Sequence, residues 1–341
     1  MLLYVYYQIY YVNIFITIYI QKILEDDKLE NQTAIVILNY NGWRDTTECL
    51  QSLLQNISDQ DTIVIIDNKS TNDSVEQIEN FMKENLIEYI KVKYNAENKL
   101  KTASKTKIVL ICSDKNLGFS GGNNIGIDFA TENNFNYILF LNNDTIVKSN
   151  FIKPSIELLN SNKQIGLVGA KIFDYYNTDS YILGGKISRY FVSGYHHHNT
   201  EEFNEKFTEF ISGCYMLTKT SIINKIGRWD EKYFLYLEDV EICNRYSQFG
   251  YKIISTNKSQ IYHKEGQSTT YKPIMYYYNT RNRLLLSSKI LKSKFEFFRF
   301  GILFFASRII IVIKKPSVFK FILLGFHDYI NGKFGEYRDE Y

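Results

Sequence analysis

Polar side chains follow several apolar segments of this sequence, at the points where strands of a sheet would end. Asn39–Asn41 follow one such segment, Asp67 follows the next, and Asn143 and Asp144 follow a third. In an open α/β sheet, ligands bind just beyond the carboxyl ends of the strands. Carboxylate and amide oxygens there can bind a hard divalent cation and contact a bound diphosphate. A turn or a helix N-cap is the structural alternative, because Asn and Asp favour both.

A glycine-rich segment, residues 116–124, follows another apolar run and contains Gly118, Gly121 and Gly122. Glycine lets the backbone approach a ligand closely and exposes N–H groups to phosphate or ribose oxygens. The spacing matches neither a Walker loop, which needs a following G-K-[ST], nor the pattern G-x-G-x-x-G. A tight connection from strand to helix is the structural alternative.

Two adjacent carboxylates, Glu238 and Asp239, precede a helical pattern at residues 240–249. The dipole of such a helix favours a charged carboxylate at its start, so the position predicts a lowered pKa for Asp239. An ordinary N-cap, with Glu241 and Arg245 as an i,i+4 ion pair, would explain these residues without any chemistry.

The histidines fall into two groups. His196–His198 are consecutive, and three adjacent side chains cannot converge on one metal ion with good geometry. We expect that run to lie in a solvated loop. His263 stands alone after an apolar region, and a lone histidine of this kind usually has a structural role.

The elements that must position these groups alternate between strand and helix. Helical patterns separate the first three apolar runs, which is the βαβ signature of a parallel sheet. Asp45 and Glu48 would make a capping box for the first helix. The predicted strands are residues 34–38, 63–66, 108–112 and 137–141.

Composition narrows the class of protein. The 341 residues are 45% hydrophobic and 16% aromatic, which is enough apolar material for a substantial core. The net charge of +3 is nearly balanced and gives no electrostatic case for nucleic acid. The four cysteines are scattered without a C-x-x-C pair, which argues against a zinc site or a disulfide framework and fits a reducing compartment.

Both ends of the chain invite a membrane interpretation. Residues 2–20 carry no charge and predict a membrane anchor or an interfacial helix, with a peripheral extension as the alternative. Residues 284–326 mix aromatic and aliphatic side chains with lysine and arginine. That mixture suits helices lying on an anionic membrane surface, although packing against the preceding domain is also open.

Taken in order, these motifs resemble those of glycosyltransferase family 2, most closely the rhamnosyltransferase-like members that build bacterial surface polysaccharides. The resemblance covers residues 34–283 and is specific because many motifs occur in a fixed order. The matching segments are Ile37–Asn41, Ile66–Thr71, Asn116–Asn124, Leu141–Asp144, Ile211–Leu217, Gly227–Glu231, Tyr236–Glu241, and His263 with Gly266 and Ser268.

The resemblance implies an α/β protein with the GT-A (nucleotide-diphospho-sugar transferase) fold. Its sheet would be mixed and mainly parallel, and a C-terminal helical region would follow it. We expect an N-terminal hydrophobic segment and linker at residues 1–30 and a catalytic domain at residues 31–275. Residues 276–341 would form a helical, membrane-associated region.

The resemblance also implies roles for particular residues. Asp239 would be the catalytic base that takes the proton of the acceptor hydroxyl. Asp144 and His263 would bind Mg²⁺ or Mn²⁺ at the donor diphosphate. Asn142 stands where many relatives carry aspartate, which leaves one carboxylate in this motif and weakens metal binding without the nucleotide.

Two further sets of residues would contact the substrates. On the acceptor side, the active site would be lined by Trp229, Asp230 and Glu238. Asp67 would accept a hydrogen bond from the nucleotide base. The residues implied in donor binding are Asn39, Tyr40, Asn41, Asp67, Asn116, Gly118, Phe119, Gly121, Gly122, Asn124 and Asn143.

The implied activity is an inverting transfer of rhamnose or another hexose from a nucleotide-diphosphate donor. The acceptor would be a hydroxyl of a glycan or a lipid-linked saccharide in cell-surface polysaccharide synthesis, at the cytoplasmic face of the cell membrane. A non-catalytic nucleotide-sugar or glycan-binding protein on the same fold is the competing class. A sugar nucleotidyltransferase would need a basic, glycine-rich phosphate loop, which residues 39–44 do not supply.

Overall fold

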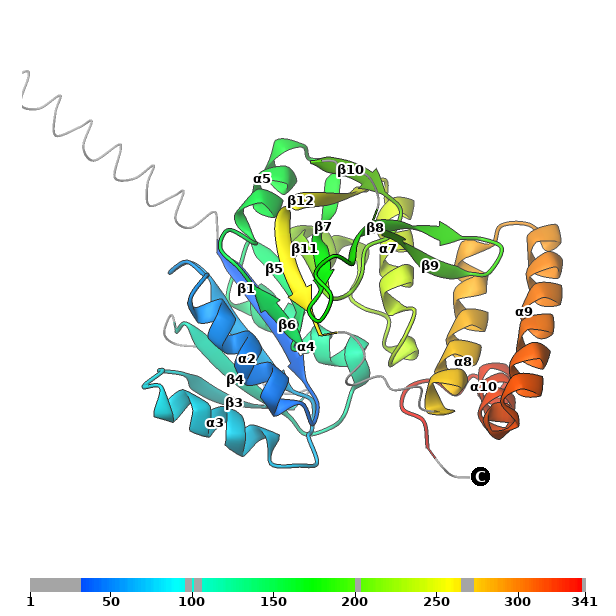
Figure 1. The fold of residues 1–341 in the computed structure, drawn as a ribbon, viewed down its shortest axis with the longest axis horizontal. Coiled ribbons are helices and arrows are strands. Elements are labelled where there is room, and N and C mark those ends of the chain that lie inside the picture. The colour runs from blue at the N-terminus through cyan, green and yellow to red at the C-terminus, as the bar shows by residue number, and fades with distance from the viewer. Residues whose placement is uncertain (1–31, 96–99, 101–105, 200–203, 265–272, 339–341) are drawn as a thin grey trace, which may run out of the picture.

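The computed structural model describes residues 32–95, 100, 106–199, 204–264 and 273–338. The hydrophobic segment at residues 2–20, and Gly266 and Ser268 of the family motifs, lie outside the described residues. The described chain forms one twelve-stranded mixed sheet with helices on both faces and a group of helices at one side (Figure 1).

One half of the sheet is parallel. β1 (Thr33–Asn39) lies between β5 (Tyr137–Asn142) and β2 (Thr62–Asp67). β2 pairs with β4 (Ile108–Ser113), and β4 pairs with the edge strand β3 (Ile90–Tyr94). Their carboxyl ends therefore meet at one edge of the sheet, as the βαβ pattern predicted.

The other half is mixed. β11 (Tyr215–Lys219) runs antiparallel between β5 and β7 (Ile165–Asp174), and β12 (Lys252–His263) lies parallel to β7. β10 (Glu205–Thr208) adds an antiparallel edge beside β12. The short β6 (Thr145–Val147) pairs with the end of β12 and so joins the two halves.

The two faces of the sheet bury alternate residues of each strand. In β1, Ile35 and Ile37 pack on one face, and Ala34 and Val36 pack on the other, all without solvent exposure. The first face is covered by α2 (Trp43–Leu54), α3 (Ser74–Glu84) and α5 (Lys153–Ser161). The second is covered by α4 (Gly118–Glu132), α6 (Thr220–Ile226) and α7 (Glu238–Gln248).

Three helices follow the sheet: α8 (Pro273–Ile290), α9 (Lys294–Lys314) and α10 (Phe319–Ile330). They stand together at one side of the molecule, where α8 packs against α10 (Figure 1). α9 starts at a capping box between Ser293 and Glu296, and the short helix η2 (Pro316–Val318) links it to α10. The structure thus confirms the expected C-terminal helices.

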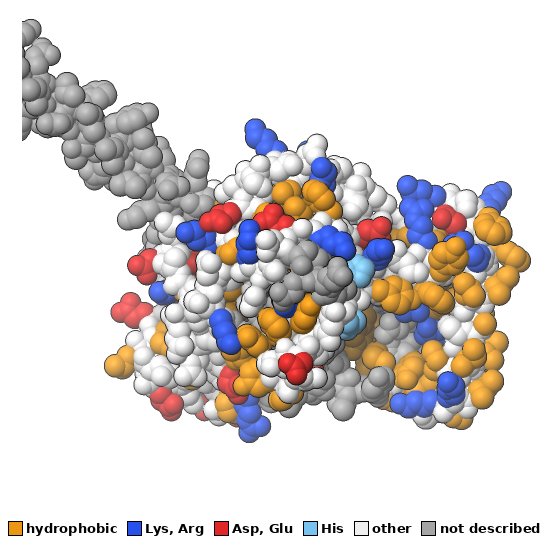
Figure 2. Space-filling model, turned by 45° about the horizontal axis from the view of Figure 1, so that its top comes forward, with side chains coloured by type: hydrophobic (Ala, Val, Ile, Leu, Met, Phe, Trp, Pro, Cys, Tyr) orange, Lys and Arg blue, Asp and Glu red, His pale blue; other side chains and the backbone are white. Residues whose placement is uncertain are grey.

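The outer surface of these helices is strongly apolar. Hydrophobic side chains gather over this end of the molecule, with lysines and arginines at their margins (Figure 2). Within the described residues, no helix has the length and apolar character needed to cross a bilayer. The exposed apolar residues of α9 and α10 are Phe295, Phe297, Phe298, Ile302, Phe305, Ile309, Ile310, Ile313, Phe319, Leu323 and Ile330.

Three local expectations were wrong. Residues 196–198 lie not in a loop but in β9 (Ser193–His198), which pairs with β8 (Tyr181–Ser188), and His196 packs on the Phe210 ring. β3 was missed, because its alternating lysines resemble a surface loop. The capping box at α2 is absent, since the helix starts after Gly42 without a side-chain cap.

Candidate active site

A hydrogen-bond network ties together the ends of β1, β2 and β5. Asn39 donates from Nδ2 to Asp67 Oδ1 at 2.8 Å, and its Oδ1 accepts from the Thr46 hydroxyl at 2.9 Å. Asn143 Nδ2 donates to the same hydroxyl at 2.9 Å. The Asp67 carboxylate also accepts from the Ser70 backbone N–H and hydroxyl. The structure therefore brings three predicted donor residues into one network.

Tyr40 and Asn41 extend this edge toward solvent. The Tyr40 side chain is 46% exposed, and Asn41 has a positive φ of 58°. Asn41 Oδ1 accepts from the backbone N–H groups of Thr71 and Asn72, which fixes the two loops to each other. The exposed Tyr40 ring is the part of this turn that a ligand could reach.

A second network holds the start of α4. Asn68 Nδ2 donates to Asn116 Oδ1 at 3.0 Å and to the Gly118 carbonyl at 2.9 Å, and Asn68 Oδ1 accepts from the Leu117 N–H. Gly118 has φ of 67°, and a Cβ there would lie 2.3 Å from the Phe234 carbonyl oxygen. The sequence motif included Asn68, but only the structure shows that it organises this turn.

Gly121 and Gly122 are not part of a free loop. Both lie buried within α4, and a Cβ on Gly122 would lie 2.3 Å from Leu38 Cδ1 of β1. A direct contact of these two glycines with the donor stays a prediction. Gly122 lets α4 pack closely on β1, and a Cβ on Gly121 would lie 2.5 Å from Leu117 Cβ.

Asn124 and Phe119 both contact Trp229. Asn124 accepts from the Trp229 N–H and donates to its carbonyl, each at 3.0 Å. The Trp229 ring meets the rings of Phe119 and Phe140 edge-on, with centroids 5.5 and 5.2 Å away. Trp229 is buried, and its Nε1 has no hydrogen-bond partner. Asn124 thus holds Trp229 in place, and a direct donor contact for Asn124 stays a prediction.

Asp144 and His263 face each other at the joint between the two halves of the sheet. Asp144 Oδ1 lies 3.0 Å from His263 Nε2, which is within hydrogen-bonding distance, and both atoms are buried. Two adjacent ligands of an octahedral ion, each bonded at about 2.1 Å, would also lie about 3.0 Å apart. The pair therefore fits a divalent cation. Among the described residues, no group of three or more acidic, histidine or cysteine side chains forms a closed metal site.

Lys264 is a neighbour that the sequence did not single out. Its buried ammonium group lies 3.2 Å from Asp45 Oδ1 and also bonds Glu48, while its backbone N–H donates to the Asp144 carbonyl at 2.9 Å. Asp45 and Glu48 therefore pair with Lys264 instead of capping α2. This arrangement anchors the chain beside His263 to α2.

Asp239 is partly exposed in the first turn of α7. Its Oδ1 accepts from the Val240 N–H at 2.8 Å, and its Oδ2 accepts from the Gly213 N–H at 3.4 Å. The N-cap is Leu237, so Asp239 is not the cap. Burial raises the pKa of Asp239 to about 6, against the opposing effect of these hydrogen bonds. The expected lowering by the helix dipole was wrong because desolvation dominates.

Glu238 is the more deeply buried member of the pair. Burial raises its pKa well above the usual range, and the nearby charge of Asp239 raises it further. Its Oε2 has no hydrogen-bond partner. Both effects favour the neutral form of Glu238, so Asp239 is the better suited of the two to accept a proton.

The backbone that leads to this pair is held in an unfavourable conformation. Phe234, Tyr236 and Leu237 have positive φ values of 47°, 71° and 71°. Non-glycine residues rarely adopt such angles, and each costs on the order of 1–3 kcal/mol. Surrounding structure must therefore fix this loop.

Asn282 of α8 supplies that fixation. It is fully buried, and its Nδ2 donates to the carbonyls of Tyr233 and Leu235 at 2.8 Å and of Tyr236 at 2.9 Å. Arg281, also fully buried, donates to the Lys232 carbonyl at 3.2 Å. The resemblance included this stretch of α8 without giving it a role, so the sequence alone did not identify Asn282.

Asp230 lies in an ion network away from Asp239. Its Oδ2 is 2.6 Å from Lys289 Nζ, and Lys289 also reaches Glu241 Oε1 at 2.9 Å. Glu241 in turn pairs with Arg245, as the helical spacing predicted. This network lowers the pKa of Asp230, although burial acts in the opposite direction. A direct contact between Asp230 and an acceptor stays a prediction.

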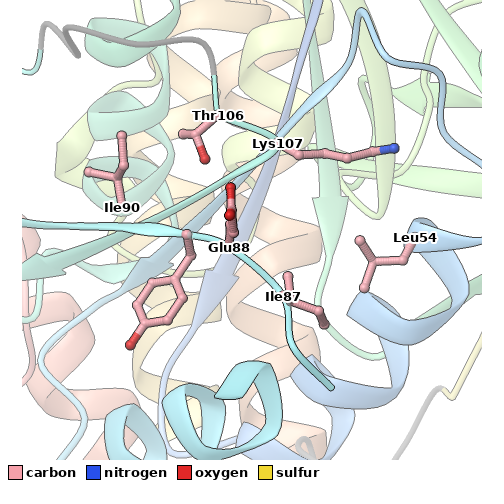
Figure 3. A pocket seen from close by; sticks show the side chains of 7 residues that line it. Leu54, Ile87, Glu88, Ile90, Thr106 and Lys107 are labelled. Atoms are coloured by element: carbon pink, nitrogen blue, oxygen red, sulfur yellow. The ribbon is translucent and has the colours of Figure 1, made fainter. Parts of the chain in front are cut away.

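A pocket elsewhere on the sheet contains none of these residues. It opens at the amino ends of β3 and β4, whereas the polar networks occupy the carboxyl ends (Figure 3). Three of the seven residues that line it are aliphatic, one is acidic and one is basic. The residues that line it are Leu54, Ile87, Glu88, Tyr89, Ile90, Thr106 and Lys107.

Comparisons with known proteins agree with this architecture. The dTDP-rhamnosyl transferase RfbF of Shigella flexneri is 26% identical over 218 residues, which cover 59% of this chain and 71% of that protein. The low-salt glycan biosynthesis hexosyltransferase Agl10 of Haloferax volcanii is 24% identical over 271 residues, 75% and 83% of the two chains.

A solved structure shows the fold. The mannosyltransferase PcManGT from Pyrobaculum calidifontis, in complex with GDP-Man and Mn²⁺, superposes with a TM-score of 0.54 at 9% identity. The match covers 89% of this chain and 88% of that one. The family model for glycosyl transferase family 2 matches residues 34–227, more than half of the sequence. The chain therefore belongs to glycosyltransferase family 2 and has the GT-A fold, as the motifs predicted.

Proposed function

We propose that this glycosyltransferase moves a hexose from a nucleotide-diphosphate donor to a hydroxyl of a glycan or lipid-linked acceptor, with inversion at the anomeric carbon. The observation that carries the proposal is the state of Asp239. It is a partly exposed carboxylate with a pKa raised to about 6, next to Gly213 and the Phe119 ring. A base of this kind is ionised at neutral pH yet binds a proton more readily than an ordinary carboxylate.

In this proposal, Asp239 takes the proton of the acceptor hydroxyl while the hydroxyl oxygen attacks the anomeric carbon. The bond to the donor diphosphate breaks on the opposite face of the sugar. The edge formed by Asn39, Tyr40 and Asp67 binds the nucleotide. The buried Trp229 packs against Phe119 and shields this side of the site from water.

The metal proposal rests on Asp144 and His263. These two buried atoms would hold Mg²⁺ or Mn²⁺ in place of their contact with each other, with the remaining ligands supplied by the diphosphate and water. When bound, the ion neutralises charge on the leaving diphosphate. The solved mannosyltransferase, whose structure contains Mn²⁺, supports this choice by analogy.

The identity of the donor is open to a direct test. The relatives named above support dTDP-rhamnose and GDP-mannose as the first candidates. Purified full-length protein should be incubated with a panel of nucleotide sugars and Mn²⁺, and release of nucleoside diphosphate should be measured. Turnover of one donor, enhanced by an added acceptor, would support the proposal. No release from any member of the panel would favour a non-catalytic nucleotide-sugar-binding protein.

Asn282 gives a prediction about the loop. Replacing Asn282 with Ala removes the donor of three carbonyl hydrogen bonds, so Asp239 should be less well positioned. We expect the turnover number to fall about tenfold to a hundredfold, with donor affinity nearly unchanged. The matched control is Asn279→Ala on the same helix, because Asn279 bonds only the Met275 carbonyl within α8.

The measurement pairs initial rates with calorimetric donor binding, and thermal melting shows that the variants are folded. Loss of donor affinity in parallel with turnover would contradict a positioning role for Asn282. Equal losses in Asn279→Ala would also contradict it.

We further propose that α9 and α10 lie on an anionic membrane surface at the cytoplasmic face of the cell membrane. Their exposed phenylalanines and isoleucines form the apolar surface in Figure 2. Lys294, Arg299, Lys314, Lys315 and Lys320 accompany them, which favours anionic phospholipid as the occupant.

A pair of surface substitutions tests this proposal without cutting the chain. Deletion after residue 284 would be unsuitable, because Leu285, Leu286 and Ile290 belong to the core. We expect the double variant Phe298→Ser, Ile313→Ser to reduce cosedimentation with phosphatidylglycerol vesicles at least about tenfold. Each substitution removes apolar surface that the membrane would bury.

The control for that experiment is Leu86→Ser, at a leucine that is 91% exposed elsewhere on the molecule. It should leave vesicle binding unchanged. If the double variant cosediments as well as the unaltered protein, α9 does not bind the membrane.

A further inference from the structure

Two arginines lie between α8 and α9 without an acidic partner. Arg308 is only 7% exposed and continues the inward-facing stripe of α9 that begins with Phe300 and Phe304. Its hydrogen bonds are long, at 3.4 Å to the Thr280 hydroxyl and 3.4 Å to the Ser307 hydroxyl. The Nε of Arg283 is buried and has no hydrogen-bond partner.

The surroundings of these guanidinium groups are positive. Tyr276, Thr280 and Arg283 share one face of α8 at i, i+4 and i+7, and Arg308 meets that face from α9. Lys315 Nζ lies 5.6 Å from the centre of the Tyr276 ring. In the described part of the chain, no carboxylate pairs with Arg283 or Arg308.

Burying the positive charges of Arg283 and Arg308 close together destabilises the folded state. Burial, together with the charge of Arg283, lowers the pKa of Arg308 to about 10. Burial likewise lowers the pKa of Arg283. Both groups nevertheless stay charged at neutral pH, and an unpaired buried charge destabilises a fold strongly. An anion bound between the helices would remove that penalty.

We propose that Arg283 and Arg308 form a binding site for the phosphate or diphosphate group of a lipid. Guanidinium groups present planar donor pairs that match phosphate oxygens. The exposed apolar surface of α9 lies on the same helix and suits a hydrocarbon chain. Asn282, the residue next to Arg283, bonds the Tyr236 carbonyl, so this site and the loop before Asp239 share one helix.

The anion itself could come from two sources, a phospholipid headgroup or the diphosphate of a lipid-linked acceptor. The second source rests on the proposed function, whereas the anion site does not. The test uses full-length protein, farnesyl diphosphate as a soluble probe, and phosphatidylglycerol vesicles. The variants are Arg308→Met and Arg283→Gln. The control is Lys314→Met, which removes an exposed cation from the same helix.

In Arg308→Met, the melting temperature without an anion should rise, whereas the affinity for farnesyl diphosphate should fall. Without any anion, Arg308→Met should melt at a higher temperature than the unaltered protein, because it removes an unpaired buried charge. Farnesyl diphosphate should raise the melting temperature of the unaltered protein and of Lys314→Met. It should bind Arg308→Met and Arg283→Gln at least about tenfold more weakly by calorimetry. Binding that survives Asp144→Ala excludes the donor site as its location.

Each result decides between the sources. Weakened binding of farnesyl diphosphate assigns the site to a lipid-linked diphosphate. Weakened vesicle binding alone assigns it to a phospholipid headgroup. If Arg308→Met lowers the melting temperature and both ligands bind as before, the arginines only join the helices and the proposal is wrong. None of these readouts depends on sugar transfer.

Discussion

Replacing Asp239 with Asn should lower the turnover number at least about a hundredfold while donor affinity changes little. Asn keeps the size of the side chain, and its oxygen can still accept the N–H of Val240. It cannot take the proton of the acceptor hydroxyl, and general base catalysis contributes about a hundredfold to ten-thousandfold. In the proposed site, the donor binds at the separate edge formed by Asn39 and Asp67. Initial rates paired with calorimetric donor binding measure the two effects separately.

The pH dependence gives a second signature of the same residue. Because the base must be deprotonated, kcat/KM should fall as the pH drops below about 6, by about tenfold for each pH unit. Asn at position 239 should remove this acidic limb.

The same residue affects the dependence of stability on pH. The pKa of Asp239 in the folded state lies above the usual 3.8. Asp239 therefore contributes most to the free energy of unfolding below pH 3.8, and this contribution is lost as the pH rises through about 6. At pH 8 the variant should therefore melt no lower than the unaltered protein.

Glu238→Gln is the matched control, since Glu238 is the adjacent carboxyl group and burial favours its neutral form. It should retain the acidic limb and most of the turnover. If Asp239→Asn keeps turnover within a few-fold of the unaltered enzyme, Asp239 is only a structural group. Glu238 would then be the next candidate base.

Removing the metal is the second change with a large expected effect. Asp144→Ala, or an excess of EDTA, should reduce turnover at least about a thousandfold, because the charge on the leaving diphosphate would lose its counter-ion. With one carboxylate in the motif, Mn²⁺ alone should bind weakly, and adding nucleoside diphosphate should strengthen its binding. Manganese titrations followed by electron paramagnetic resonance, with and without nucleotide, measure this coupling directly.

Asp174→Ala serves as the control, because Asp174 ends β7 near His263 in the sheet but contacts only the backbone of its own turn. It should leave metal dependence intact. Undiminished turnover in excess EDTA would sink the metal proposal. The loss of turnover in His263→Ala should lie between those of Asp144→Ala and Asp174→Ala. Water or the diphosphate can replace the imidazole as a metal ligand more easily than it can replace the charged carboxylate of Asp144.

Much of the sheet could be predicted because its strands are buried on both faces. The runs before Asn39, Asp67 and Asn142 are almost wholly aliphatic, and their burial confirms the predicted strands. Side chains at the ends of neighbouring parallel strands must meet, which is why the network of Asn39, Asp67 and Asn143 could be expected. β3 was missed because only one of its faces is covered, and its lysines face solvent.

The parts that could not be predicted depend on contacts between distant segments. The pKa of Asp239 rises because the whole of the surrounding structure removes water, which neighbours in sequence do not reveal. Gly122 packs on Leu38, and Asn282 bonds the loop before Asp239. Gly122 stood in a predicted motif and Asn282 did not, and the contacts of both became visible only in three dimensions.

The three hydrogen bonds from Asn282 to the loop before Asp239 also affect the order in which parts of the chain fold during synthesis. Synthesis releases the amino-terminal strands first, and domains fold as they emerge. The parallel half of the sheet is complete in the chain long before α8. The strained loop before Asp239 has few local contacts to hold it until Asn282 arrives, and such long-range contacts form late in folding. A ribosome-bound chain is thus expected to order the parallel half of its sheet early and the loop before Asp239 last.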